Sequence, residues 1–215
     1  DDERERVDKA IDILNESNIY MVNMPNFTLA TVEAYVQDYV LNHNIGYLWF
    51  DYISSQASVS GEVAMKNKVT TRDDMVLATM SSFLKDMATK YNISVSSFTQ
   101  VNANVYQQKQ MDSGCIAGSR SVVNKCDYAS ILMPLRPDEQ DIALIMIDEQ
   151  RQNGRKEIIY PNRILHVYKV RFGSHEQGAK VWINLDLSTG DVADCWVTNK
   201  DNEPYEMEKL DLRMG

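Results

Sequence analysis

Apolar residues recur every three or four positions in several segments of the chain, which is the spacing of one helix face. The clearest segment is 73–91, whose apolar members are Met75, Leu77, Met80, Phe83, Leu84 and Met87. The same spacing predicts a helix over residues 3–16, a turn and a helix over 25–44, and a helix over 137–154. Thr28 is suited to cap the second of these helices, and Pro137 and Gly154 are suited to begin and end the last one.

Short apolar runs between these helices predict strands. The runs are 18–23, 46–52, 93–100, 128–135, 162–173, 179–188 and 191–199. Alternation of the first strands with helices indicates an α/β fold with a mainly parallel central sheet flanked by helices. The sequence STGD at 188–191 predicts that the last two strands form an antiparallel hairpin. We expect residues 53–72 and 101–118 to be loops, and Trp49, Phe50, Trp182 and Trp196 to lie in the core.

Composition narrows the class of protein. With 215 residues, 44% of them hydrophobic, the chain is long enough for one globular domain. It has 22 basic and 31 acidic residues, and this net charge of −9 excludes a nucleic-acid binder that uses its whole surface. The net charge is still compatible with a small basic patch that binds nucleic acid when several copies of the chain come together. Three cysteines without CxxC spacing favour a reducing compartment over a disulfide scaffold or a zinc site.

Two polar residues follow strands of the predicted parallel sheet. Asp51 follows the apolar run IGYLWF, and Gln100 ends the next strand. In such sheets ligands bind at the carboxyl ends of the strands. A carboxylate there can hold Mg²⁺ beside nucleotide phosphates, and an amide can sense the γ-phosphate or orient the attacking water. Alone, each residue is equally compatible with an ordinary strand end or a loop cap at the surface.

Two further groups of cations suit phosphate binding. Lys169 and Arg171 alternate at the end of a later strand, so both lie on one face. They can reach a nucleotide phosphate, in the same subunit or in a neighbour, or they can keep an edge strand soluble. The stretch GCIAGSRSVVNK, from Gly114 to Lys125, includes Gly118, Ser119 and Arg120. Its amides, hydroxyls and cations suit contact with a nucleic-acid backbone, and an ordinary loop that opens a helix is the alternative.

In this order the motifs resemble the motor domain of DnaB-type replicative helicases, including phage primase-helicases. IGYLWFDYI resembles that family's Walker B strand, and FLKDMATKYNISVSSFTQVN resembles its helix and strand that end in glutamine. GSRSVVNKCDYASILM is similar to its DNA loop and following strand, and HVYKVRFG is similar to its Lys-x-Arg finger strand. The resemblance extends over roughly residues 8–197.

The resemblance implies a RecA-like fold that assembles as a homo-hexameric ring with ATP between subunits. Asp51 would hold Mg²⁺ and Gln100 would sense the γ-phosphate. Arg171 with Lys169 would reach the adjacent subunit's nucleotide. Gly118, Ser119, Arg120 and Lys125 would contact single-stranded DNA in the channel, and primase or a helicase loader would be a partner. The expected location is the cytoplasm of a bacterial or phage-infected cell.

One motif of that family is absent. It requires a Walker A loop, GxxxxGK[ST], upstream of Walker B, and no Gly-Lys pair occurs in this sequence. We therefore expect residues 1–200 to be a partial motor domain that is inactive alone, followed by an acidic tail at 201–215. The alternatives are a RecA-like recombinase or clock-type ATPase, and a catalytically silent RecA-like module used for oligomerisation.

Overall fold

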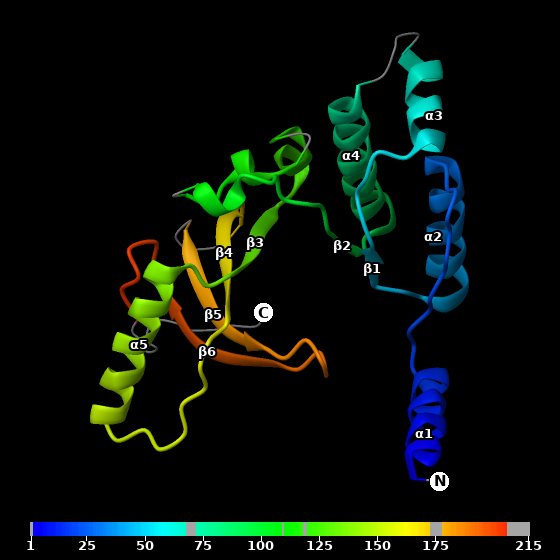
Figure 1. Cartoon of the computed structure of the whole chain (residues 1–215). Coiled ribbons are helices and arrows are strands. Elements are labelled where there is room, and N and C mark those ends of the chain that lie inside the picture. Colours follow the sequence, from blue (N-terminus) through cyan, green and yellow to red (C-terminus); the bar gives the residue numbers. More distant parts are fainter. Residues whose placement is uncertain (1, 68–71, 109, 118–119, 173–177, 206–215) are drawn as a thin grey trace.

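The chain forms two lobes, each with its own strands, joined by a segment of short 3₁₀ helices (Figure 1). The structure is a computed structural model that describes residues 2–67, 72–108, 110–117, 120–172 and 178–205. The helical lobe contains α2 (Leu29–His43), β1 (Tyr47–Phe50), α3 (Ala57–Asn67), α4 (Asp73–Tyr91) and β2 (Ser94–Ser97), and α1 (Asp2–Glu16) precedes it. The joining segment contains η1 (Val105–Gln107), η2 (Ser113–Cys115) and η3 (Arg120–Lys125). The sheet lobe contains β3 (Tyr128–Pro134), α5 (Pro137–Gln152), β4 (Arg163–Val170), β5 (Ala179–Leu185) and β6 (Val192–Thr198).

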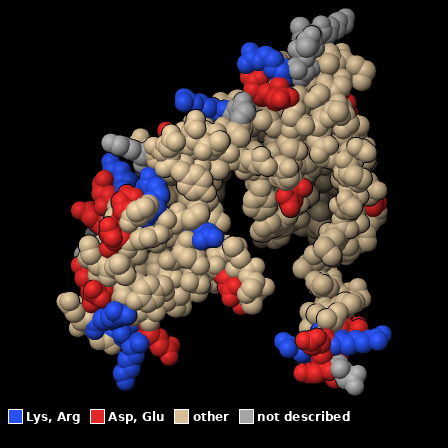
Figure 2. All heavy atoms as spheres, viewed as in Figure 1, with Lys and Arg blue, Asp and Glu red and all other residues tan. Residues whose placement is uncertain are grey.

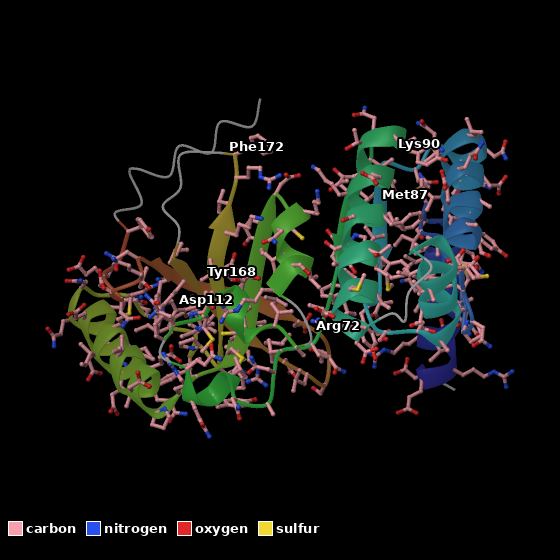
Figure 3. All side chains as sticks on the ribbon, turned by 90° about the horizontal axis from the view of Figure 1, so that it is seen from above. Arg72, Met87, Lys90, Asp112, Tyr168 and Phe172 are labelled. Carbon is pink, nitrogen blue, oxygen red and sulfur yellow. The ribbon has the colours of Figure 1, made fainter. Side chains whose placement is uncertain are left out.

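Helix α2 begins after the predicted cap Thr28. Thr28 caps α2 by accepting a hydrogen bond from the amide of Thr31 at 3.1 Å. Asn44 and Asn92 end α2 and α4 in the left-handed conformation, which asparagine tolerates better than most residues. The bounds of α4 agree with the helix expected over 73–91, and Met87 points into the layer between the helices (Figure 3).

Helix α3 lies in a stretch, residues 53–72, for which the sequence predicts a loop. Serines and a glycine lower the helix propensity of this stretch. Val59 and Val63, four residues apart, are nevertheless both buried in the core that includes Val76 and Met80 of α4. Burial of this apolar face stabilises the helix against its weak local preference.

The expectation of a mainly parallel central sheet is wrong for the described residues. Only β1 and β2 pair in parallel, with Phe50 opposite Ser97 at their carboxyl ends. Strands β3, β4, β5 and β6 form a separate antiparallel sheet in that order, which includes the predicted β5–β6 hairpin. The later strands are joined by connections that return the chain beside itself, and this geometry produces antiparallel neighbours. The chain therefore has an α/β fold with two sheets.

Each sheet has an unpaired edge near the junction of the lobes. Among the described strands, β2 bonds only to β1, and β3 bonds only to β4. The two sheets lie on opposite sides of the space between the lobes, and the space-filling view shows an open notch there with few charged side chains on its visible walls (Figures 1 and 2). An unpaired edge exposes backbone donors and acceptors that can bond to another strand.

Apolar side chains are also exposed where the sequence predicts a strand and a core tryptophan. Residues 18–23 form no strand, and Ile19 and Met21 are 63% and 84% exposed. No residue of α1 is buried. Trp49 is 70% exposed, which contradicts its predicted core position, whereas Trp182 is fully buried. A strand needs a hydrogen-bonded neighbour, and the described residues supply none for 18–23.

No helix in the described ranges has the length and apolar character to cross a membrane.

Candidate nucleotide and nucleic-acid site

The carboxyl ends of β1 and β2 hold Asp51 and Gln100 on neighbouring strands. Ile53 donates its amide to the carbonyl of Phe98 at 2.8 Å, so the pairing continues beyond the regular strands. Asp51 is exposed and directly follows β1, and its peptide bond to Tyr52 is cis. Its carboxylate makes no hydrogen bond or ion pair with any described residue, so both oxygens are available to a ligand.

Gln100 connects the end of β2 to the segment that leads to η3. Its carbonyl accepts a hydrogen bond from the amide of Ala117 at 2.9 Å, and Val101 forms an isolated bridge with Ile116. The side chain of Asn102 donates to the carbonyl of Gly114 at 2.7 Å. The exposed Gln100 side chain therefore sits on backbone that is bonded to the polypeptide just before the predicted DNA loop.

Helix η3 carries the described part of that loop. Arg120 and Lys125, at its two ends, are exposed, whereas Val122 and Val123 between them are buried. Ser81 of α4 donates to the carbonyl of Val122 and holds the helix against the helical lobe. Gly118 and Ser119 lie outside the described residues. The structure therefore presents two cations from one anchored turn, an arrangement suited to phosphate contact.

Arg120 packs over Gly114 of η2. A Cβ atom on Gly114 would lie 3.1 Å from Nη2 of Arg120 and 2.9 Å from a carboxylate oxygen of Asp112. The Asp112 carboxylate accepts a hydrogen bond from the amide of Gly114 at 2.6 Å. Glycine at this position therefore leaves room for the Arg120 guanidinium.

Lys169 and Arg171 lie at the end of η3 rather than at the ends of β1 and β2. The Lys169 ammonium donates to the carbonyls of Val123 and Asn124, at 2.5 and 3.3 Å. Arg171 donates from Nη2 to the carbonyl of Asn124 at 3.1 Å and pairs through Nη1 with Asp127 at 3.3 Å. Phe172, the next residue, is 73% exposed at the far end of β4 (Figure 3). Within one chain the two cations thus contact the predicted DNA-binding helix.

Comparison with known proteins identifies the family. The family model described as the DnaB-like helicase C terminal domain matches residues 1–177. The chain belongs to this DnaB-like family. It is also 32% identical, over 99% of its length, to the SPbeta prophage-derived uncharacterized protein YorI of Bacillus subtilis (strain 168). The match spans only 42% of YorI, so the chain corresponds to less than half of that curated relative.

Two solved structures share the fold. One is an ATPase domain that superposes with a TM-score of 0.61 at 14% identity, covering 89% of this chain and 60% of that one. A DnaB-like replicative helicase, solved in a study of its interactions with primase, superposes with a TM-score of 0.60 at 15% identity, covering 89% of this chain and 42% of that one. Because each match covers 89% of this chain, the shared fold includes parts of both lobes.

Sequence reasoning misses Asp127 and Lys85 at this DnaB-like site. Lys85 of α4 pairs with the Asp127 carboxylate, which also binds Arg171. The hydrogen bond from Lys85 lowers the pKa of Asp127, and the charge of Arg171 acts in the same direction. A charge directly before the apolar strand β3 is a weak signal in the sequence. The pairing of β3 with β4, which brings Arg171 to Asp127, is visible only in the structure.

A second buried polar group lies away from this site, where α5 meets β4. Glu139 is 1% exposed and accepts hydrogen bonds from the amide and guanidinium of Arg136, at 3.0 and 2.8 Å. His166 lies 3.9 Å from the same carboxylate, and burial lowers its pKa to about 4. Tyr168 of the same strand packs against the separate cluster that includes Cys115 of η2, and burial raises the pKa of Tyr168 to about 12. The bonds between Arg136 and Glu139 cap the start of α5, and His166 brings β4 against this cap. None of the predicted site residues belongs to this group.

Proposed function

We propose that this chain is part of an ATP-dependent replicative DNA helicase that translocates on single-stranded DNA. The observation that carries the proposal is the position of Asp51 and Gln100, at the carboxyl ends of adjacent parallel strands in a DnaB-like domain. An unpaired carboxylate and an amide at this edge are suited to Mg²⁺ and a γ-phosphate. The chemistry supplied by Mg²⁺ is neutralisation of charge on the phosphates.

Asp51 fits a magnesium ion of this kind. The described residues contain no cluster of three or more His, Cys, Asp or Glu side chains that could enclose a metal. Mg²⁺ beside a nucleotide is commonly held by one or two carboxylates together with phosphates and waters, so a single exposed carboxylate is sufficient. On this account Asp51 binds the ion and Gln100 senses the γ-phosphate.

On this proposal, the phosphate-binding loop is supplied by polypeptide outside residues 1–215. The GxxxxGK[ST] pattern is absent from this sequence, and the chain covers only 60% of the similar ATPase domain. The free edges of β2 and β3 and the exposed apolar residues 19–22 are where further strands would bond and pack. The same additions would cover Trp49. We infer that residues 1–215 alone do not hydrolyse ATP.

We further propose that copies of the complete motor assemble as a homo-hexameric ring. In that ring, Arg171 and Lys169 reach the nucleotide of the neighbouring subunit. Arg171 is 43% exposed, so its guanidinium is accessible to a second chain. Six copies would bring Arg120 and Lys125, with Gly118 and Ser119, to one central channel for single-stranded DNA. Such a local ring of cations is compatible with the net charge of −9. Primase or a helicase loader is the proposed protein partner.

The test is ATP hydrolysis by the complete motor with and without single-stranded DNA, combined with native mass spectrometry. The proposal predicts hexamers whose turnover is stimulated by DNA. Turnover on open filaments would favour a recombinase-like ATPase. Hexamers without any turnover would favour a silent oligomerisation module.

A further inference from the structure

Three cations from two elements meet at the carboxyl end of η3. Lys85 of α4 places its ammonium 2.5 Å from one oxygen of Asp127, and Arg171 places Nη1 3.3 Å from the other. Arg171 and Lys169 also donate to the carbonyl of Asn124. Carbonyls at the end of a helix carry partial negative charge, so this position favours cations. Asp127 is the carboxylate on which two of the three converge.

The backbone fixes this arrangement as one unit. The amide of Arg171 donates to the carbonyl of Asp127 at 2.8 Å, which joins the end of β4 to the residue between η3 and β3. Ser81 bonds the middle of η3 to α4, and Lys85 of the same helix bonds Asp127, two residues beyond the end of η3. A shift of the Arg171 guanidinium therefore changes the hydrogen bonds that hold the end of η3.

An anion near Arg171 would compete for the same donors. The guanidinium has five N–H groups in a rigid fork, and here Nη1 and Nη2 face Asp127 and the Asn124 carbonyl. A phosphate that engages this fork must share it with, or displace, those two partners. A phosphate bound at Arg171 would therefore change the bonds that hold η3, and with them the position of Arg120 and Lys125 on that helix.

We propose that Asp127 is a positioning residue that couples a nucleotide phosphate at Arg171 to nucleic acid at η3. The inference rests on the proposed function, because it requires a phosphate at Arg171 and DNA at η3. Coupling between two ligands is reciprocal, so each ligand changes the affinity of the other by the same factor. Asp127 itself touches neither ligand, and its carboxylate acts through Arg171 and Lys85.

The first experiment measures this factor in the complete motor. The Kd for a fluorescent oligothymidine is compared with and without a non-hydrolysable ATP analogue and Mg²⁺. In the wild type, we expect the ATP analogue to change the Kd for the oligothymidine by at least about fivefold. We expect less than about twofold in Asp127→Asn and a restored change in Asp127→Glu. Asp86→Asn, on the exposed side of α4, is the matched control and should retain the wild-type change. A wild-type change in Asp127→Asn would overturn the inference.

The second experiment uses residues 1–215 and needs no ATPase activity. Trypsin cuts after Arg120 and Lys125 when η3 opens locally, and this rate follows the population of the open state. We expect about tenfold faster cleavage in Asp127→Asn than in Asp86→Asn, since one charge-assisted anchor is removed. Equal rates would overturn the inference. Failure of the wild-type motor to bind nucleotide would instead reject the proposed function.

Discussion

Ser97 donates its hydroxyl hydrogen to the carbonyl oxygen of Phe50, with 2.7 Å between the two oxygens. The two residues are register partners at the carboxyl ends of β2 and β1. Asp51 follows Phe50 directly, and Gln100 lies three residues beyond Ser97. This cross-strand bond therefore helps to fix the distance between the proposed metal ligand and the proposed phosphate sensor.

Removal of this hydroxyl should destabilise the strand ends. We expect Ser97→Ala to lower the free energy of unfolding of residues 1–215 by about 1 kcal/mol, because the half-buried Phe50 carbonyl loses a partner. Urea denaturation measures the difference. Ser94→Ala is the control on the same strand, because Ser94 is exposed, and it should change stability by less than about 0.5 kcal/mol. Equal losses in the two variants would contradict the assigned role of the bond.

Subunit mixing tests whether Arg171 acts on a neighbour's nucleotide. We expect complete motors carrying Asp51→Ala or Arg171→Ala to lose ATP hydrolysis, with ATP binding largely retained in Arg171→Ala. Rings mixed from the two variants should regain part of the activity, because some interfaces combine an intact Asp51 with an intact Arg171. Arg163→Ala, at the opposite end of β4, is the control and should leave turnover unchanged. Mixed rings without activity would place Arg171 in its own subunit's site.

Arg120 should bind a phosphate of single-stranded DNA. We expect Arg120→Ala in the complete motor to weaken binding of oligothymidine and to make the affinity less dependent on salt, because fewer counterions are released. The slope of log K against log salt should fall in magnitude by about 0.7 for each phosphate that is no longer neutralised by a bound subunit. Arg4→Ala on α1 serves as a control of equal charge. An unchanged slope in Arg120→Ala would move the DNA-binding surface to another part of the chain.

His166 should make the stability of the chain dependent on pH. Burial lowers its pKa in the folded state to about 4, whereas an unfolded histidine titrates near 6.5. Between these values the unfolded state binds more protons, so the free energy of unfolding falls as the pH falls from 6.5 to 4. The expected slope from this group is at most about 1.4 kcal/mol per pH unit. His166→Gln should remove this contribution to the pH dependence of the free energy of unfolding. The control His43→Gln, at an exposed position, should retain it. Chemical denaturation at several pH values measures both variants, and an unchanged pH dependence in His166→Gln would contradict the assignment.

Local sequence patterns predict the helices well and the sheets less well. The cap residue Thr28 marks the start of α2, and apolar spacing marks α4, so their expected bounds agree with the observed ones within a residue or two, whereas α3 has no such signal. Strand pairing depends on contacts between distant segments, which periodicity does not reveal. For this reason the separate sheet that begins with the β3–β4 pair and the unpaired residues 18–23 differ from expectation, whereas the β5–β6 hairpin, which a local turn sequence marks, is confirmed.

The residues of the candidate site also differ in how far the sequence reveals them. Asp51 and Gln100 are predictable because a polar residue after an apolar strand is visible in the sequence, and the structure places their strands side by side. Asp127 has no such signal, since its importance comes from the register that sets β4 against β3 and from the packing of Lys85 beside η3. The core position predicted for Trp49 is wrong because an aromatic residue in an apolar strand does not reveal which polypeptide covers it.

The most direct measurement is the rate of DNA-stimulated ATP hydrolysis by the complete motor carrying Asp51→Asn. Asp141→Asn, at an exposed position of α5, makes the same charge change away from the site. The account predicts loss of turnover by at least about a hundredfold in Asp51→Asn, because charge stabilisation of phosphoryl transfer is removed, and wild-type turnover in Asp141→Asn. Wild-type turnover in Asp51→Asn would contradict the assignment of this strand end as the nucleotide site.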